Sequence, residues 1–462
     1  MKIDLIQPRH SYAPAQGLGH IYMPTSLLTA GARLLAAGVD VEFHDENITG
    51  ATITSDNVGV NLLGAPYIPE VIKLQQRIRK DYGDKTFFIG GQVVSGLDIH
   101  QRTRLFGDST YSGNDDATLA EVLGIDIKSL SFPSQTSLIP AYEKINDPTM
   151  KEYLSREFSL SVSQGCKFSC NFCAAVRTFK HPITGKTMKV TESYRDIDII
   201  KVDLQYLVRR AASYGLDQLQ LYMSNLDVFQ TPRKLLEFAY AVQDVRNNNP
   251  QVGIRLRGLA TVGSFIDADT SAPRSIEELI RAGFHTVGFG VDGWGKEEWA
   301  ALRKGHNTEE ECLGAIRVAR ENYGITPEIL MVFGNPRTTK KDSIKAALHV
   351  TEMVVTKYGA IPRPHVSKDF IPGNDGWLKQ EYAEAVENLM QHPGSFQSLD
   401  FTALPSPLTH PNKRIRELAT EYFLKMCELP GNTTQWVKPI TPGLSRDEIE
   451  LIKNFNEGRF DR

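Results

Sequence analysis

The sequence predicts an α/β protein built from two successive strand–helix units, followed by a mostly helical C-terminal region. Two observations lead to this fold class. Short apolar segments alternate with amphipathic helical patterns along most of the chain, and a compact group of three cysteines divides the alternation into two parts. The 462 residues exceed what one compact core of ordinary size contains, so we expect several domains. The patterns place them at 1–125, 126–156, 157–375 and 376–462.

The first unit, residues 1–125, contains four short apolar segments typical of buried strands, with helical segments between them. In the helical pattern at 24–38 leucines share one face, Thr25 and Ser26 mark the start, and Gly38 is a typical end. This alternation predicts a parallel, doubly wound sheet whose ligand crevice lies beyond the carboxyl ends of the strands. The predicted strands are 2–8, 41–46, 57–64 and 85–91, the second helix is 68–83, and the crevice segments are 8–19, 63–67, 90–94 and 113–116.

The second unit follows a proline-containing segment with little periodicity, residues 126–156, which we interpret as a linker. Six strand–helix units in 157–375 are fewer than a full eight-unit barrel contains, so the pattern predicts a partial, open barrel. Beyond residue 376 the chain becomes polar and mostly helical. The predicted strands of this unit are 158–166, 218–224, 253–260, 286–293, 328–334 and 363–370, and helices are expected at 206–215, 275–283 and 309–322.

Composition excludes several classes of partner. The chain has 52 Lys+Arg against 55 Asp+Glu, a net charge of −3, so no overall positive field exists to hold nucleic acid or an anionic membrane. No apolar run approaches the ~18 residues that span a bilayer, and Pro8 interrupts the start before a signal-peptide apolar region develops. Five cysteines are too few for a disulfide framework. We therefore expect a cytoplasmic protein that binds neither nucleic acid nor membrane.

The cysteine group is the most specific feature of the sequence. Cys166, Cys170 and Cys173 give three thiolates on one loop after a predicted strand. Structural zinc sites and ferredoxin clusters both use four protein ligands, whereas a four-iron, four-sulfur cluster held by three cysteines leaves one iron open to a substrate group. Two alternatives remain: three coincidental core cysteines, or a zinc site completed by His181. The spacing favours the cluster.

These residues resemble the signature of the radical S-adenosylmethionine superfamily, CxxxCxxC with an aromatic residue before the last cysteine, here Phe172. Segments 221–229, 289–310, 333–343 and 370–375 are similar to further motifs of these enzymes. The resemblance implies a [4Fe-4S] cluster whose open iron binds S-adenosylmethionine. One electron, from a donor such as flavodoxin or ferredoxin, then releases a 5′-deoxyadenosyl radical. The protein must orient the cofactor and exclude water.

Further cofactor-binding residues follow from the same resemblance. Asp292 stands where the family has a glutamate. Four further candidates lie at strand ends or inside the predicted barrel: Ser224, Asn225, Asp227 and Arg257. Each of these four could equally be a barrel residue whose polar groups are satisfied by its neighbours.

Cys312 and Cys427 are isolated and are interpreted as small buried hydrophobic residues.

Residues 1–125 resemble the Rossmann-like cobalamin-binding domain that precedes the radical domain in one large subclass. The chain lacks the D-x-H-x-x-G motif after its first predicted strand, so the resemblance implies cobalt without a protein histidine. Glycines in the crevice let backbone approach a large flat ring. The alternative is a Rossmann-like domain kept only as scaffold. The candidate cobalamin-binding residues are Gly64, Ala65, Pro66, Gly90, Gly91, Gln92 and Gly113.

Together these features predict a cobalamin-dependent radical S-adenosylmethionine enzyme that methylates an unactivated carbon or phosphorus of a small metabolite or natural-product precursor. One alternative is a radical cyclase or rearrangement enzyme with the same two domains, with or without cobalamin. Another is a non-catalytic iron–sulfur sensor, which the lack of a recognisable nucleic-acid-binding module disfavours.

Overall fold

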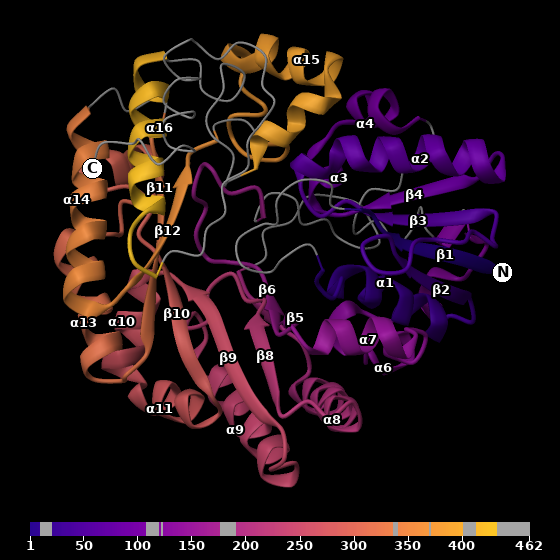
Figure 1. Cartoon of the computed structure of the whole chain (residues 1–462), viewed down its shortest axis with the longest axis horizontal. Helices are drawn as coiled ribbons and strands as arrows, with labels where there is room; N and C mark the ends of the chain where they lie inside the picture. Colours follow the sequence, from indigo (N-terminus) through magenta and orange to yellow (C-terminus); the bar gives the residue numbers. More distant parts are fainter. Residues whose placement is uncertain are drawn as a thin grey trace.

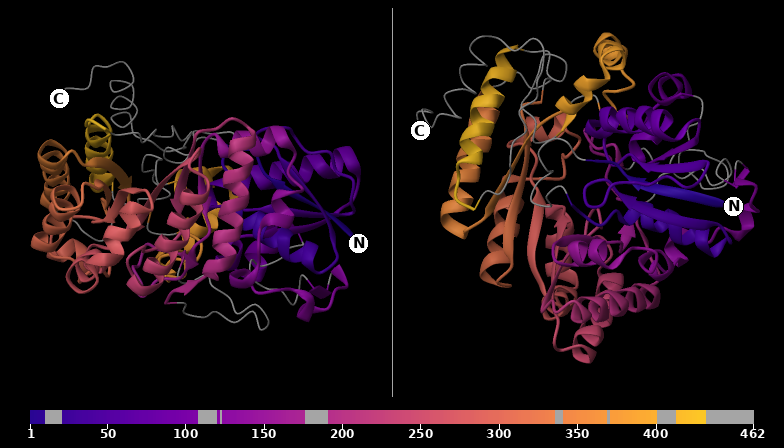
Figure 2. Two further views of the ribbon diagram at one scale, coloured as in Figure 1. Left: turned by 90° about the horizontal axis from the view of Figure 1, so that it is seen from below. Right: turned by 45° about the vertical axis from the view of Figure 1, so that its right-hand side comes forward.

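The computed structural model describes most of the chain and confirms the predicted α/β class. The described residues are 1–9, 21–107, 120–121, 123–175, 191–335, 341–368, 371–400 and 413–431. They form a four-stranded sheet near the N-terminus and a six-stranded sheet in the middle of the chain. Figure 1 shows the first sheet in indigo and purple and the second in magenta to orange, and Figure 2 shows the two units side by side.

The N-terminal sheet is parallel and is covered on both faces, as predicted. Its strand order is β2-β1-β3-β4. Ile3 and Leu5 of β1 pack with the leucines of α1, while Ile6 packs on the opposite face with α2, because successive side chains of a strand alternate between faces. The elements are β1 (Lys2–Gln7), α1 (Thr25–Ala36), β2 (Asp40–Asp45), β3 (Asn57–Asn61), η1 (Ala65–Tyr67), α2 (Ile68–Tyr82), β4 (Thr86–Gly90), α3 (Gln92–Gly96) and α4 (Ile99–Phe106).

The second sheet is the predicted partial barrel. All six strands are parallel, in the order β12-β11-β10-β9-β8-β5, which leaves β12 and β5 at the edges of the sheet. The strands are β5 (Glu157–Leu160), β8 (Gln218–Met223), β9 (Gly253–Ala260), β10 (Phe284–Gly290), β11 (Thr326–Phe333) and β12 (Ile361–Val366). The helices are α8 (Ile197–Ser213), α9 (Pro232–Asn248), α10 (Val262–Ser271), α11 (Pro273–Arg281), α12 (Lys296–Ala301), α13 (Glu309–Glu321), α14 (Lys341–Tyr358) and α16 (Lys413–Cys427).

Strand alternation gives the barrel an apolar outer face and a polar inner face. On β9, Ile254 and Leu256 are buried in the core beneath the helices, whereas Arg255 and Arg257 alternate with them and point to the inner side. Cys312 of α13 is fully buried in the same core, as predicted for a small hydrophobic residue. The inner face therefore carries the groups available for chemistry.

The segment interpreted as a linker is folded. It contains η2 (Ile127–Ser129), η3 (Pro133–Gln135), α6 (Ile139–Tyr142) and α7 (Asp147–Leu154). Tyr142 and Leu154 belong to the barrel core. The buried carboxylate of Asp203 on α8 accepts hydrogen bonds from the Leu138 amide (3.1 Å) and from Arg195 (2.6 Å). The segment is therefore held by contacts with residues distant in sequence, which its own local pattern does not indicate.

Residues 371–400 return to the N-terminal domain and complete its core. The elements are η5 (Gln380–Tyr382), α15 (Ala383–Gln391) and η6 (Pro393–Leu399). Trp377, Leu389 and Phe396 pack with residues of α2 and β3, and Arg104 of α4 pairs with Glu387 at 2.9 Å. Figures 1 and 2 show this orange segment beside the purple helices.

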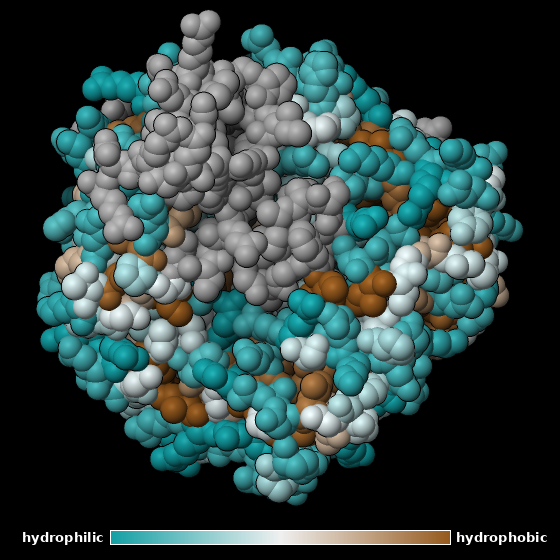
Figure 3. Space-filling view, viewed as in Figure 1, coloured by the Kyte–Doolittle hydropathy of each residue, from teal (hydrophilic) through white to brown (hydrophobic). Residues whose placement is uncertain are grey.

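The surface of the described residues is mostly hydrophilic in the view of Figure 3, where hydrophobic residues form small separate patches. Among the helices that the structure describes, none has the length and apolar character needed to cross a membrane.

Candidate active site

The three cysteines lie on one loop at the mouth of the barrel. The loop follows β6 (Ser163–Gln164), which pairs antiparallel with β7 (Ser193–Tyr194). Gly165 has a φ of 98°, a conformation that favours glycine, and so lets the chain turn into the loop. Cys166 is buried, Cys170 and Cys173 are partly buried, and the Cys173 amide donates to the Cys170 carbonyl at 3.2 Å.

The donor set fits a cluster better than a single zinc ion. A structural zinc site uses four protein ligands, whereas the described part of this loop offers three cysteines. Burial raises the pKa of Cys166 and of Cys170 to about 11 in each case, so a bound metal would have to supply the positive charge that stabilises their thiolates. The Phe168 amide donates a hydrogen bond to the Cys166 sulfur. His181, the alternative zinc ligand, lies outside the described residues.

The cysteine loop is attached to the turn after α12 at two points. The Asn171 amide donates to the Leu302 carbonyl at 3.2 Å, and its side chain donates to the Ala301 carbonyl. The Phe168 ring stacks on His306, with 4.1 Å between ring centroids. The loop and the 301–306 turn therefore form one unit.

Asp292 follows β10 and forms a buried ion pair. Its φ is 50°, and its carboxylate contacts the ammonium group of Lys304, which also donates to the Gly290 carbonyl. Burial acts to lower the pKa of Lys304, but the charge and hydrogen bond of Asp292 together with the nearby Cys170 and Cys312 outweigh it, and the pKa is raised. Lys304 lies in the segment 289–310, but the sequence predicted no role for it, and a lysine this deeply buried is rare without a partner.

The three predicted residues after β8, Ser224, Asn225 and Asp227, differ from one another in what they contact. The Ser224 side chain lines the cavity described below, and its amide donates to the Leu160 carbonyl at 3.0 Å. Asn225 donates to Ser163 at 2.7 Å. Asp227 is fully buried and accepts hydrogen bonds from Thr261 (2.8 Å) and Ser264, which ties the ends of β8 and β9 together.

Glu192, which the sequence did not indicate, orients this group. Its carboxylate accepts hydrogen bonds from Ser163 at 2.8 Å and from Thr231. It lies 3.4 Å from the Asn225 amide nitrogen, and the Asn225 side-chain oxygen is buried without a protein partner. Asn225 is thus held in one orientation with an acceptor atom left for a ligand. The signal was missed because Glu192 is more than 30 residues distant in sequence from Asn225.

Arg257 lies inside the barrel in a charge network. Its guanidinium group makes a bidentate pair with Glu157, contacts Glu328 at 3.2 Å, and stacks over the Tyr222 ring. Arg363 on β12 donates to the other oxygen of Glu328 at 2.8 Å. The two acids and two bases neutralise one another and connect β5, β9, β11 and β12.

A cavity of about 460 Å³ connects the two units. Its barrel side is formed by Ser159, Ser161, Gln164 and Ser224. On its other side it runs between α1 and the N-terminal sheet, from the carboxyl end of β4 to the apolar interior of the domain. Arg33 is the single charged residue among its described lining. The lining residues of the N-terminal domain include Ile3, Leu5, Ala30, Leu34, Gly59, Asn61, Phe88, Gly90, Gly91, Gln92 and Ser95.

Of the six predicted crevice residues that the structure describes, three line this cavity and three do not. Gly91 requires glycine, since its φ is 130° and an added Cβ would lie 2.2 Å from the Leu62 carbonyl oxygen. Ala65 and Pro66 are instead buried in η1, which turns them toward the core of the domain, while the flanking Leu63 and Tyr67 line the cavity. Gly64 precedes η1 and does not line the cavity, and Gly113 lies outside the described residues.

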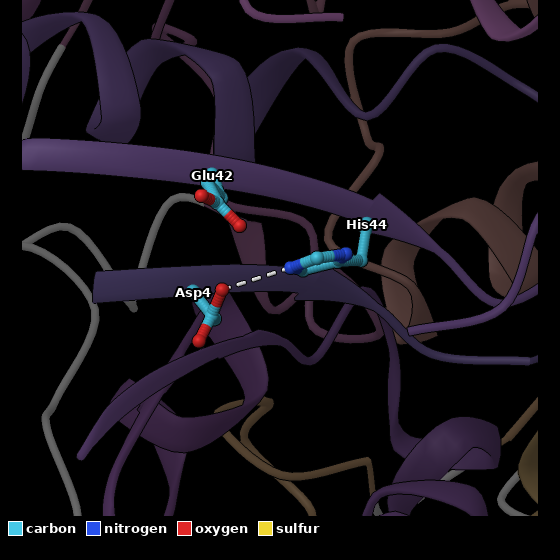
Figure 4. A group of neighbouring side chains, drawn as sticks. All are labelled: Asp4, Glu42 and His44. Atoms are coloured by element: carbon cyan, nitrogen blue, oxygen red, sulfur yellow. Dashed lines mark hydrogen bonds and ion pairs between the residues drawn. The ribbon is translucent and has the colours of Figure 1, made fainter. Parts of the chain in front are cut away.

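A second polar group, on the N-terminal sheet, consists of Asp4, Glu42 and His44 (Figure 4). The His44 ring points at Asp4, with 2.9 Å between the ring nitrogen and the carboxylate oxygen. The other Asp4 oxygen accepts the amides of Thr54 (2.9 Å) and Ser55 (2.7 Å). These hydrogen bonds assign the group a structural role.

The fold and the cysteine loop together define the class of protein: a parallel partial barrel whose strand-end loop carries three cysteines is the architecture of a radical S-adenosylmethionine (SAM) enzyme. Residues 160–347 match the family model of the radical SAM superfamily. Residues 160–347 therefore form a radical SAM domain, and this domain implies a [4Fe-4S] cluster and SAM as cofactors. No curated protein sequence matches the chain.

Solved structures of two proteins share the two-domain architecture. The chain is similar to TsrM from Kitasatospora setae, a radical SAM methyltransferase solved with tryptophan substrate and a SAM analogue; the TM-score is 0.60 and identity 14%, over 83% of this chain and 76% of that chain. It is also similar to OxsB, a cobalamin-dependent SAM radical enzyme, with a TM-score of 0.54 and 14% identity, over 86% of this chain and 56% of that chain. At these identities the likeness concerns the fold.

Proposed function

We propose that this protein is a cobalamin-dependent radical SAM methyltransferase that acts on an unactivated carbon or phosphorus of a small molecule. The observation that carries the proposal is the single cavity that joins the crevice of the N-terminal domain to the mouth of the barrel. A reaction that uses two cofactors on one substrate needs such a shared space. The solved TsrM structures, one with cobalamin and a [4Fe-4S] cluster bound, support this interpretation.

The described residues fit cobalamin. Gly90 and Gly91 leave room for a flat ring, and Asn61, Gln92 and Ser95 offer polar groups to its amide substituents. The cavity continues beneath α1 past Gly59, where an added Cβ would lie 2.4 Å from Leu5, and this slot suits an extended tail. When bound, cobalamin would supply a carrier for the methyl group. No histidine occurs among the described lining residues.

The barrel side of the cavity offers small polar groups to SAM and substrate. Ser159, Ser161 and Ser224 line it with hydroxyl groups, and no acidic side chain occurs among the described lining residues. Below this level the barrel is filled, because an added Cβ at Gly288 would lie 2.7 Å from both Leu259 and Leu330. The substrate therefore binds between the barrel mouth and the N-terminal crevice rather than deep in the barrel.

The first experiment is anaerobic reconstitution with iron, sulfide and hydroxocobalamin, followed by gel filtration and measurement of both cofactors. The unaltered protein should retain about four irons and about one cobalamin per chain. Ala30→Trp fills the cavity from α1 and should abolish cobalamin retention while iron is kept. Ala36→Trp, on the exposed side of the same helix, is the matched control and should retain both. Equal cobalamin retention by the two variants would contradict the proposal.

A second measurement separates methylation from cyclisation or rearrangement. With a reductant and SAM labelled at its methyl group, a methyltransferase acting on an unactivated carbon forms S-adenosylhomocysteine as well as 5′-deoxyadenosine and moves label to an acceptor, whereas a radical cyclase forms 5′-deoxyadenosine without S-adenosylhomocysteine and leaves the methyl group on methionine. Changing Cys166, Cys170 and Cys173 together to alanine should abolish iron binding and both products. A low-potential protein such as flavodoxin or ferredoxin is the proposed electron donor.

A further inference from the structure

A buried ammonium group lies beside the cysteine loop and has no role in the reaction outlined above. The Lys304 side chain is 3% exposed. Its nitrogen contacts the Asp292 carboxylate and the Gly290 carbonyl, and it can reach them because residue 290 is glycine: an added Cβ would lie 3.0 Å from the Lys304 nitrogen. The ion pair thus occupies the end of β10 on the inner side of the barrel.

The backbone holds this ammonium group against the cluster ligands. Asn171 follows Cys170 directly and is hydrogen-bonded through its amide and its side chain to Leu302 and Ala301. Phe168 stacks on His306, so the loop contacts the turn on both sides of Lys304. The buried ammonium group of Lys304 is therefore held on the same turn to which the loop of the cluster ligands is attached.

We propose that Lys304 is a positioning residue that holds a positive charge beside the iron–sulfur cluster and so raises the cluster's midpoint potential. One-electron reduction of a [4Fe-4S] cluster from its 2+ to its 1+ state adds one negative charge, which a nearby buried cation stabilises more strongly than a solvent-exposed one. Asp292 keeps Lys304 protonated in the interior and partly offsets this effect. The inference rests on the radical SAM domain and is independent of cobalamin.

The test is a redox titration of the reconstituted protein with dithionite and mediators in the absence of SAM, monitored by the electron paramagnetic resonance signal of the reduced cluster. Lys304→Gln should make the midpoint potential more negative, and Lys304→Arg should restore it. Asp292→Asn leaves the ammonium group uncompensated and should move the potential in the positive direction. Lys167→Gln removes an exposed charge next to Cys166 and is the matched control, for which we expect a smaller shift.

A purely structural role predicts a different pattern. If Lys304 only stabilises the turn, the variants would lower the iron content without changing the midpoint potential of the cluster that forms. Shifts of the same sign in Lys304→Gln and Asp292→Asn would also overturn the proposal. Lys304→Gln leaves Asp292 buried without its cation, which can prevent folding. In that case the comparison of Asp292→Asn with Asp292→Asn/Lys304→Gln isolates the lysine charge, and the double variant must have the more negative potential.

Discussion

At the scale of single residues, the inner face of the barrel depends on charges that neutralise one another across strands. Arg257 is the centre of this network, since it contacts Glu157 on β5 and Glu328 on β11. Sequence reasoning placed Arg257 inside the barrel but could not identify its partners, which lie 100 and 71 residues away in the chain. Which side chains pair across parallel strands depends on the strand register, and no local pattern in the sequence reveals it.

Arg257→Met should destabilise the protein by about 3 kcal/mol, because Glu157 would remain in the barrel without its cation and Glu328 would keep only Arg363. Arg255→Met is the matched control: Arg255 lies two residues earlier on the same strand and is exposed, so its loss should cost less than about 0.5 kcal/mol. Urea unfolding of the three proteins measures the difference. Equal unfolding midpoints for the two variants would show that the network contributes nothing measurable.

Cofactor-binding residues could be predicted where neighbouring residues in the sequence form a recognisable motif, and less well where their place depends on the folded structure. Cys166, Cys170 and Cys173 form a compact motif, and the structure brings them onto one loop. Gly91 was predicted from the glycines at a strand end, and its positive φ and close approach to the Leu62 carbonyl show why glycine is required there. Ala65 and Pro66 were placed in the crevice by proximity to a strand end, but a turn of helix directs them into the core, which the sequence pattern does not reveal. The roles of Asn225, Asp227, Arg257 and Asp292 toward SAM stay predictions.

At the scale of secondary-structure elements, the predicted strands and long helices agree with the structure because their apolar periodicity is strong. Residues 253–260 were predicted as a strand and form β9. The helices α6 and α7 were missed because elements of four and eight residues are too short to show a helical period. Tertiary contacts such as the Asp203 hydrogen bonds to residue 138 form them instead.

Asp4 connects β1 to β2 and to the segment before β3, and this connection should depend on pH. Burial acts to raise the pKa of Asp4, but hydrogen bonds from His44, Thr54 and Ser55 outweigh it and lower the pKa below the ordinary 3.8. A lowered pKa contributes stability above the ordinary value, and that stability is lost as the pH falls through the folded-state pKa. The acid loss of stability should therefore lie below about pH 4.

Asp4→Asn should lower stability by about 1–3 kcal/mol at neutral pH, since the amide replaces one of the two acceptor oxygens by a donor. It should also flatten the loss of stability below about pH 4 that Asp4 causes in the unaltered protein. Thermal unfolding across this pH range measures both effects. Glu42→Gln, which alters a partly exposed ion pair with Lys2, is the control and should change stability by less than about 1 kcal/mol. An identical pH profile for Asp4→Asn and the unaltered protein would contradict this role.

At the scale of the whole molecule, the C-terminal part of the chain joins the two units. Residues 371–400 begin beside the cysteine loop, where the Asp375 amide donates to the Asn171 carbonyl at 3.3 Å. They then contact α3, since an added Cβ at Gly96 would lie 2.6 Å from the Gly373 nitrogen. The segment thus touches both the cluster loop and the domain proposed to bind cobalamin. Sequence reasoning predicted a helical C-terminal region but could not assign its packing partner, because an amphipathic helix does not reveal which core it completes.

This arrangement predicts that the N-terminal domain depends on α15 for its stability. Leu389 is fully buried in the core that also contains residues of α2, so Leu389→Ala should destabilise the protein by about 2–5 kcal/mol through loss of apolar burial and the cavity left behind. Leu378→Ala is the matched control, because Leu378 is 81% exposed and should be near neutral. Hydrogen exchange of amides in α2 and β3 locates the effect: Leu389→Ala should speed exchange there while the barrel strands β8 and β9 keep their protection. Unchanged exchange in α2 would mean that the C-terminal segment only covers a domain that is already stable, and that the N-terminal unit is complete without it.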